Sequence, residues 1–508
     1  MSLLGLDIGT SGVKALLIDE SGKTLASATS EYPLSTPHPN WAEQDPADWW
    51  KGTVKVIREV LALPGVRAED IKGIGLSGQM HSLVLLDRQQ RVLRPSILWC
   101  DTRTDRECVQ ITEQVGRDKL RTFVSNPALE GFTLPKIIWV RNNEPEVFAK
   151  IHTVLLPKDY IRFLLTGEFA MEVSDAAGTI MFDVARRAWS TPLLKILNVP
   201  AEWLPAVFES IDVCGRVTRA TADLTGLREG TPVVGGGADN TCGAVGTGVV
   251  KQGRVLASIG TSGVVFAFSD QVRVEPGMRV HTFCHSVPGA WYLMGVVLMA
   301  GGALRWYRDT FAQEEVALAR ASGRDVYDIL TEEASVVAPG SEGLFFLPYL
   351  VGERTPHQSA SARGAFIGAT IRHTKQHFTR AVLEGITFGM KDSLAIMEGL
   401  GVEITQIRLT GGGAKSAFWR KLQANVYGRE VALVNASEGP AFGAALLAGA
   451  GTRVYSNLVD AVENVVNVTE TIAPDPEQVK RYAELFSIYQ DLYPVLRSSF
   501  MRIHSLER

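Results

Sequence analysis

Cysteine is scarce in this chain of 508 residues, which contains only five. The cysteines are widely spaced, and no two of them form a Cys-x-x-Cys pair; they are Cys100, Cys108, Cys214, Cys242 and Cys284. An odd number without paired spacing argues against a disulfide framework and against a zinc site. We therefore expect a protein of a reducing compartment, in the cytoplasm.

A large charge of one sign is also absent. Lysine and arginine number 51 against 55 aspartate and glutamate residues, which gives a formal net charge of -4 at pH 7. A balance so close to neutral provides no general attraction to nucleic acid or to an anionic membrane surface. We expect neither of these as a partner.

Long apolar runs are missing as well. The most apolar internal stretch, Ala290 to Leu304, is interrupted by glycines and is shorter than the ~20 residues that a membrane helix needs. No basic segment precedes an apolar one at the N-terminus, and Asp7 interrupts the first apolar run, so we expect no signal peptide. A hydrophobic content of 46% and this length instead favour a soluble globular protein with at least two cores, at ~100–200 residues per domain.

The most informative stretch that is present is Leu3 to Asp19. Two apolar runs with β-type spacing flank the turn Gly9–Gly12, and this pattern predicts a hairpin. The glycines let a ligand approach the backbone closely, and the amides and hydroxyls of Thr10 and Ser11 would face that ligand. Such a turn suits a phosphate group, although a simple chain reversal is the common alternative.

Two charged residues flank the same turn. Lys14 adds a positive charge after it, and Asp7 places a single carboxylate just before it. Phosphate donors beside one acid are what a nucleotide phosphate and its magnesium ion require. The hairpin therefore predicts a site for both.

The hairpin sequence returns about half a chain later. Ile8 to Val13 reads Ile-Gly-Thr-Ser-Gly-Val, and Ile259 to Val264 repeats it letter for letter between two further apolar runs. One copy in each half predicts two lobes of related topology that face one nucleotide. Because Asp7 is matched by Ser258 in the second copy, only the first hairpin carries an acid for the metal.

Elsewhere the chain alternates strands, turns and helices, which predicts an α/β sheet with ligands beyond the carboxyl ends of its strands.

Asp239 follows the glycine-rich turn 235–237 at the start of a helix, where the helix dipole would hold it ionised. An ordinary helix cap is the alternative. Gly301 opens another helix. The strand 407–410 runs into the turn 411–414 and then a helix, an arrangement typical of nucleotide binding.

Taken singly, several residues have an ordinary structural explanation. His81 would be a polar residue at a strand end and Met80 a core residue. Lys136 would be a solvated lysine at a helix start, and Arg354 and His357 would be surface residues of a turn. The joint occurrence of two phosphate hairpins, an acid between them and a downstream glycine turn favours function over these separate explanations.

Further motifs resemble, in chain order, those of the FGGY family of carbohydrate kinases. They are Trp41-Ala-Glu-Gln-Asp-Pro-Ala-Asp-Trp-Trp50, Gly78-Gln-Met-His81, Phe132-Thr-Leu-Pro-Lys-Ile-Ile-Trp139, Leu156-Pro-Lys-Asp-Tyr160, Ser174-Asp-Ala-Ala-Gly-Thr179 and Gly352-Glu-Arg-Thr-Pro-His357. The resemblance extends to about Gly449. It implies an α/β fold of two ribonuclease-H-like lobes, as in actin-like ATPases, around a central cleft. We expect residues 1–247 to form the sugar-binding lobe and residues 248–508 the ATP-binding lobe.

The resemblance also implies roles for individual residues. Asp239 matches the catalytic base, Asp7 the acid that organises Mg²⁺, and Met80, His81 and Asn240 the sugar contacts. Lys14 and Gly301 are added to the expected ATP-binding residues because of their places beside the first turn and at a helix start. The expected ATP-binding residues are Thr10, Ser11, Lys14, Gly260, Thr261, Gly301, Gly412, Gly413 and Ala414.

Within the family, the motifs are most similar to those of kinases that convert D-xylulose to D-xylulose 5-phosphate with ATP. Two positions near the expected pocket depart from that pattern, because Ala238 and Cys100 stand where glycine and asparagine are usual. A kinase for another sugar or polyol, such as L-ribulose or gluconate, is an alternative. A non-enzymatic actin-like ATPase is a second alternative, although no linker to a peptide-binding domain is visible. Family members are often dimers, which allows a homodimer here.

Overall fold

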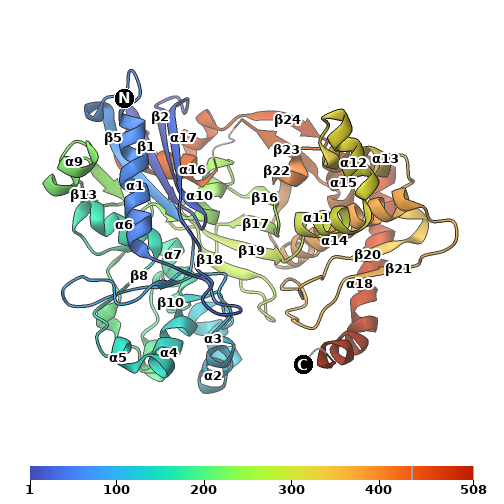
Figure 1. Ribbon diagram of the computed structural model, residues 1–508, viewed down its shortest axis with the longest axis horizontal. Helices are drawn as coiled ribbons and strands as arrows, with labels where there is room; N and C mark the ends of the chain where they lie inside the picture. Colours follow the sequence, from blue (N-terminus) through green and yellow to red (C-terminus); the bar gives the residue numbers. More distant parts are fainter. Residues whose placement is uncertain (436–438, 507–508) are drawn as a thin grey trace.

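Two mixed β-sheets of seven strands each form the centres of two lobes (Figure 1) in the computed structural model, which describes residues 1–435 and 439–506. The first sheet has the strand order β13-β14-β5-β1-β2-β3, with β15 paired to β5. Its strands are β1 (Ser2–Ile8), β2 (Gly12–Asp19), β3 (Thr24–Glu31), β5 (Ile71–Gly78), β13 (Val213–Arg216), β14 (Pro232–Val234) and β15 (Gly237–Ala238).

The second sheet repeats this topology, with the order β18-β19-β17-β16-β22-β23-β24. In each lobe the first strand is antiparallel to the second and parallel to the strand on its other side, as β1 is to β2 and β5, and β16 is to β17 and β22. The strands are β16 (Gly253–Ile259), β17 (Gly263–Ser269), β18 (His281–Cys284), β19 (Trp291–Val297), β22 (Ile404–Gly411), β23 (Glu430–Val434) and β24 (Val468–Ile472). The two predicted hairpins are therefore confirmed as equivalent elements of two related lobes.

Helices cover both faces of each sheet because the strands are apolar on both sides. In β1, Leu4 and Leu6 belong to the core beneath α1, and Leu3 belongs to the core on the opposite face. The principal helices are α1 (Pro46–Leu61), α4 (Thr133–Asn143), α6 (Pro157–Thr166), α7 (Val173–Gly178), α10 (Asp239–Gly246), α11 (Gly301–Phe311), α14 (Lys375–Gly399), α15 (Ala417–Tyr427), α16 (Pro440–Gly451) and α18 (Pro476–Ser505).

Helix ends follow the capping signals in the sequence. Asp45 caps α1 by accepting a hydrogen bond from the amide of Ala47 at 2.9 Å, and Pro46 occupies the first turn. Asp475 and Pro476 begin α18 in the same way, and its aromatic residues pack on the second core. The apolar stretch 290–304 is a strand-to-helix junction, β19 followed by α11.

The other elements lie around these two layers. They are β4 (Glu43–Gln44), β6 (Val84–Leu86), β7 (Ser96–Ile97), α2 (Asp105–Val115), α3 (Arg117–Val124), α5 (Pro145–Phe148), β8 (Thr153–Leu155), β9 (Met171–Glu172), β10 (Phe182–Asp183), β11 (Ala188–Trp189), α8 (Thr191–Leu197), β12 (Val207–Phe208), α9 (Arg219–Thr225), α12 (Gln313–Ser322), α13 (Val326–Ser335), β20 (Phe345–Leu347), β21 (Ala365–Ile367) and α17 (Leu458–Val465).

Two helices, α10 and α16, join the lobes at the centre of the molecule (Figure 1). Helix α16 belongs to the second half of the sequence but packs on β1 and β5 of the first sheet. It also crosses α10 closely, because a Cβ atom on Gly443 would overlap the carbonyl oxygen of Cys242. The division at residues 247 and 248 stays a prediction, and α16 is a part of the second half that the first sheet buries.

Candidate active site

Two cavities lie on either side of the turn between β16 and β17. The first, of about 450 Å³, is lined by Asp239, Asn240, Met80 and His81 from the first half and by residues of the second half that include Ser262. The second, of about 310 Å³, is lined by Gly260, Thr261, Gly301, Gly412 and Gly413, among others. The turn 260–262 thus contributes to both cavities. We call them the acceptor cavity and the nucleotide cavity.

Asp239 lies in the acceptor cavity at the first position of α10. Its carboxylate accepts hydrogen bonds from the amide of Asn240 at 2.7 Å and from the Asn240 side chain at 3.2 Å. Burial and the nearby charge of Asp7 raise the pKa of Asp239 from 3.8 to about 7, against the opposing effect of the Asn240 amide. The expectation that the helix start holds this group ionised is therefore wrong, because desolvation outweighs the helix dipole. A carboxyl group with this pKa can accept a proton near neutral pH.

Asp7 lies near the end of β1, next to the first turn. Its Oδ1 atom is buried without a hydrogen-bond partner in the described structure. Burial raises the pKa of Asp7 to about 6, while Ser77 and the charge of Lys14 act in the opposite direction. Lys14 faces Asp7 across the β1–β2 ladder.

An unsatisfied carboxylate oxygen of this kind fits a magnesium ion. Among the described residues, no three histidine, cysteine, aspartate or glutamate side chains gather into a metal-binding group. Magnesium commonly keeps several waters and uses only one or two protein carboxylates together with substrate phosphates. Asp7 could therefore hold Mg²⁺ as a protein carboxylate ligand, together with waters and substrate phosphates.

Four residues outside the predicted set support the first turn, Gly9–Gly12. Gln44 donates to the carbonyl of Thr10 at 2.7 Å, and Trp99 donates to the Thr10 hydroxyl at 2.8 Å. Tyr32 and Gln79 both donate to the carbonyl of Gly9. Gln44 and Gln79 stand inside two of the family motifs, so the sequence contained a signal for them. Tyr32 lies outside every motif.

His81 lines the acceptor cavity in a left-handed backbone conformation, with φ of 68°. Its Nδ1 lies 2.7 Å from the carbonyl oxygen of Gly178, to which it donates, so Nε2 is the ring nitrogen left for a ligand. Burial and the positive charge of Lys136 hold its pKa well below 6.5, and the ring is neutral. A neutral imidazole suits a contact with a sugar hydroxyl.

Lys136 is not the solvated lysine that the sequence suggested. Its side chain is fully buried and donates to the carbonyls of Gly131, Phe132 (3.1 Å) and His81 (3.3 Å). Burial lowers its pKa from 10.5 to about 7. The first turn of α4 therefore holds the backbone of His81 in place.

Arg354 also differs from the expectation of a surface turn, because it lines the acceptor cavity. Glu130 and Asp239 line the same cavity, so acids outnumber the single arginine there. His357 points elsewhere: its ring stacks on Tyr493 with centroids 3.7 Å apart. Of the two departures from the family pattern, Cys100 lines the acceptor cavity and Ala238 does not.

The nucleotide cavity is formed where three backbone turns meet. The amide of Gly301 donates to the carbonyl of Gly260 at 2.9 Å, and a side chain on Gly301 would overlap that oxygen. The predicted turn 412–414 forms a 3₁₀ turn; Gly412 and Gly413 line the cavity, whereas Ala414 does not. Thr10, Ser11, Lys14 and Asp7 lie outside both cavity linings. Residues not predicted that line this cavity include Arg305, Asp325, Tyr327, Lys415, Ser416 and Trp419.

Two sheets of the same topology, with a nucleotide cavity and an acceptor cavity that share one glycine turn, are the architecture of a two-lobed sugar kinase. Residues 2–246 match the N-terminal domain of the FGGY family of carbohydrate kinases, and residues 255–452 match its C-terminal domain. The chain belongs to this family.

Individual relatives agree with that assignment. The chain is 40% identical to the xylulose kinase of Bacillus subtilis over 491 residues, covering 97% of this chain and 96% of that protein. It is 30% identical to the gluconokinase of the same organism, covering 100% of this chain and 98% of that protein. The crystal structure of xylulose kinase from Rhodospirillum rubrum superposes with a TM-score of 0.92 at 32% identity, covering 99% of this chain and all of that one. The predicted actin-like fold class is confirmed.

Within residues 1–435 and 439–506, no helix is both long and apolar enough to cross a membrane.

Proposed function

We propose that this protein transfers the terminal phosphoryl group of ATP to D-xylulose, with Asp239 as the general base. The observation that carries the proposal is the turn 260–262, which lines the nucleotide cavity on one side and the acceptor cavity of Asp239 on the other. A phosphoryl group at this turn has only a short path to a sugar hydroxyl beside Asp239.

Proton transfer is the task of Asp239. A sugar hydroxyl is too weak a nucleophile at neutral pH unless a base accepts its proton as the bond to phosphorus forms. The bond from phosphorus to the leaving oxygen of ADP breaks as the new ester bond forms. The raised pKa of Asp239 makes it able to take up that proton and release it later.

The two glycine turns position the phosphoryl group. Thr10 and Thr261 occupy equivalent places in the first and second hairpins, so their amides and hydroxyls can donate to the group from both lobes. Asp7 would hold Mg²⁺, which neutralises phosphate charge when bound. Closure of the cavity walls excludes water, which otherwise competes with the sugar as acceptor.

The charge of the acceptor cavity favours a neutral sugar over gluconate. Asp239 and Glu130 line it with Arg354 as the one cationic partner, and the neutral His81 adds no charge. A gluconate carboxylate would add a further negative charge next to the base. Relatives of both kinds exist, and this charge balance supports D-xylulose over gluconate as the acceptor.

A panel of acceptors in an ADP-release assay tests the proposal. D-xylulose should stimulate ADP release far more than L-ribulose, gluconate or glycerol. Strong preference for gluconate would overturn the choice of sugar. Slow ATP hydrolysis that no sugar stimulates would overturn the kinase assignment and favour the non-enzymatic alternative.

We propose further that the enzyme works in the cytoplasm as a homodimer. All five cysteines are free, which suits a reducing compartment. The family resemblance supports the dimer. Light scattering on the purified protein tests it against the 55.3 kDa mass of one chain.

A further inference from the structure

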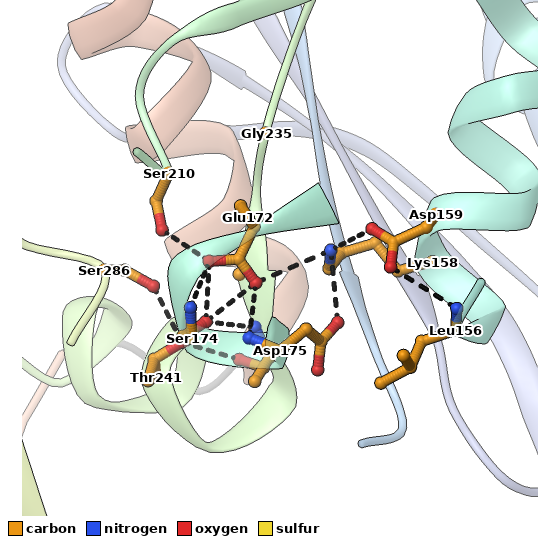
Figure 2. Close-up of polar contacts among 12 residues, drawn as sticks. Leu156, Lys158, Asp159, Glu172, Ser174, Asp175, Ser210, Gly235, Thr241 and Ser286 are labelled. Carbon is orange, nitrogen blue, oxygen red and sulfur yellow. Dashed lines mark hydrogen bonds and ion pairs between the residues drawn. The ribbon is translucent and has the colours of Figure 1, made fainter. Parts of the chain in front are cut away.

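Five charged side chains from the first half of the chain are buried together, and the proposed mechanism uses none of them. Lys158 lies 2.6 Å from Asp159, 3.1 Å from Asp175 and 3.5 Å from Glu172. Arg162 completes the set through an ion pair with Asp159 at 2.8 Å. All five are essentially inaccessible to solvent. Buried charges require partners, and Figure 2 shows the ammonium group of Lys158 between the carboxylate of Asp159 and those of Glu172 and Asp175.

Glu172 connects this cluster to α7. Its carboxylate accepts hydrogen bonds from the amides of Ser174 at 2.8 Å and Asp175 at 2.9 Å, and so caps the helix. It also accepts from the hydroxyls of Ser174 at 2.8 Å and Ser210 at 3.0 Å (Figure 2). The cluster therefore fixes the start of the helix.

Ser174 connects α7 to the catalytic segment. Because its hydroxyl donates to Glu172, its oxygen is oriented to accept the amide of Ala238 at 3.0 Å. Ala238 directly precedes Asp239. Three residues earlier, the carbonyl of Gly235 accepts from Arg162 at 2.8 Å. The cluster thus holds the strand before Asp239 at two points.

The other end of α7 reaches the sugar contacts. Its last residue, Gly178, offers the carbonyl that accepts from His81 Nδ1 at 2.7 Å. A Cβ atom on Gly178 would lie 2.9 Å from atoms of both His81 and Met80. Ser174 and Gly178 are four residues apart on α7, about one helical turn, so both contacts belong to one short element.

We propose that α7 is a positioning element that sets the base and the sugar contacts relative to each other, through Ser174 at one end and Gly178 at the other. The inference rests on the proposed role of Asp239. Ser174 and Gly178 are positioning residues, and the buried ion cluster keeps α7 in one place. The two ends should then affect different kinetic constants.

Four variants test this assignment in steady-state kinetics with D-xylulose and ATP. Ser174→Ala removes the acceptor of the Ala238 amide, and a displacement of Asp239 should lower kcat at least about tenfold while leaving the KM for ATP within about twofold. Gly178→Ala should act mainly on the KM for the sugar by displacing His81 and Met80. Ser210→Ala is the matched control, because its hydroxyl also donates to Glu172 but, in the part of the chain that the structure describes, forms no hydrogen bond to residues 237–241. Asp239→Asn reports on the base itself.

Thermal unfolding of each variant separates positioning from stability. We expect Ser174→Ala and Ser210→Ala to lose similar stability, with kcat falling only in Ser174→Ala. A kcat within twofold of wild type in Ser174→Ala, or an equal loss in Ser210→Ala, would overturn the inference. If Asp239→Asn is inactive in that case, the positioning role of α7 is overturned but the proposed function is retained. If Asp239→Asn stays active, both the positioning role and the proposed function are overturned.

Discussion

Asp239 lies where burial and a neighbouring carboxylate both oppose its ionisation. Its pKa of about 7 and the pKa of about 6 for Asp7 share one main cause, since both groups are desolvated by burial; the charge of Asp7 adds to the effect at Asp239. Such values suit a proton acceptor that must also release its proton near neutral pH.

The rate should depend on pH through Asp239. Since the base must be ionised to accept a proton, kcat/KM for the sugar should rise with pH and reach half its plateau near pH 7, the raised pKa. A profile measured from about pH 5 to about pH 9 at saturating ATP checks this. A midpoint near pH 4, the ordinary range for aspartate, would contradict the assigned environment.

The same pKa has a consequence for stability. The folded pKa of about 7 lies above the unfolded value of 3.8, so the folded state binds this proton more tightly. The resulting stability is fully present below about pH 4 and is lost as pH rises through about 7. Asp239→Asn should therefore stabilise the fold above pH 7, on the order of 4 kcal/mol, with a smaller gain near pH 5. Denaturant unfolding of the wild type and Asp239→Asn at both pH values measures the difference in their free energies of unfolding. Equal differences at the two pH values would exclude the buried charge as the cause.

At the scale of elements, the position of Asp239 depends on the close crossing of α10 and α16. Gly443 of α16 touches the carbonyl of Cys242 on α10, and no side chain fits between them. A shift of α10 moves the base, because Asp239 is its first residue. The close crossing is therefore a requirement of the site as well as of the core.

Substitution of Gly443 should show this dependence. Gly443→Ala should destabilise the protein by about 2–4 kcal/mol and lower kcat. Gly243→Ala is the matched control on α10, since a Cβ there would meet nothing within 4 Å. It should be neutral or stabilise by up to about 1 kcal/mol. Thermal unfolding and kcat are measured for both variants. Equal losses of stability and kcat in Gly443→Ala and Gly243→Ala would show that the close crossing of α10 and α16 is not the cause of those losses.

Much of this element structure follows from the sequence, and the exceptions share one origin. The hairpins, the capped helix α1 and the glycine turn at 411–414 are local, so periodicity and capping residues predict them. Lys136, Arg354 and the pKa of Asp239 depend on residues distant in sequence that bury them. Tyr32 contacts the first turn from a segment with no local signal. The features that the sequence pattern did not predict therefore depend on burial by residues distant in the sequence.

At the scale of the whole molecule, the acceptor cavity has walls from both halves of the chain, so their relative position sets its shape. Beyond the central helices, α3 of the first half contacts the second half directly. Arg117 donates to the carbonyl of Gly277 at 2.6 Å and to the Gln358 side chain at 3.0 Å. These contacts favour one arrangement of the lobes.

Arg117→Ala should loosen that arrangement. We expect the KM for D-xylulose to rise roughly two- to fivefold with kcat nearly unchanged, because an exposed charged hydrogen bond contributes about 1 kcal/mol or less. Arg58→Ala is the control: Arg58 donates to the carbonyl of Leu224 at 2.7 Å, also at the surface but within the first half. A similar rise in KM for both variants would contradict a role for the contact between halves.

The most direct test of the central claim is to identify the product of the reaction by phosphorus NMR. The protein is incubated with ATP, Mg²⁺ and D-xylulose, and the phosphorus species are followed over time. The account predicts equal amounts of ADP and D-xylulose 5-phosphate, and no sugar phosphate with Asp239→Asn. Inorganic phosphate as the main product, formed at a rate that the sugar does not change, would contradict it.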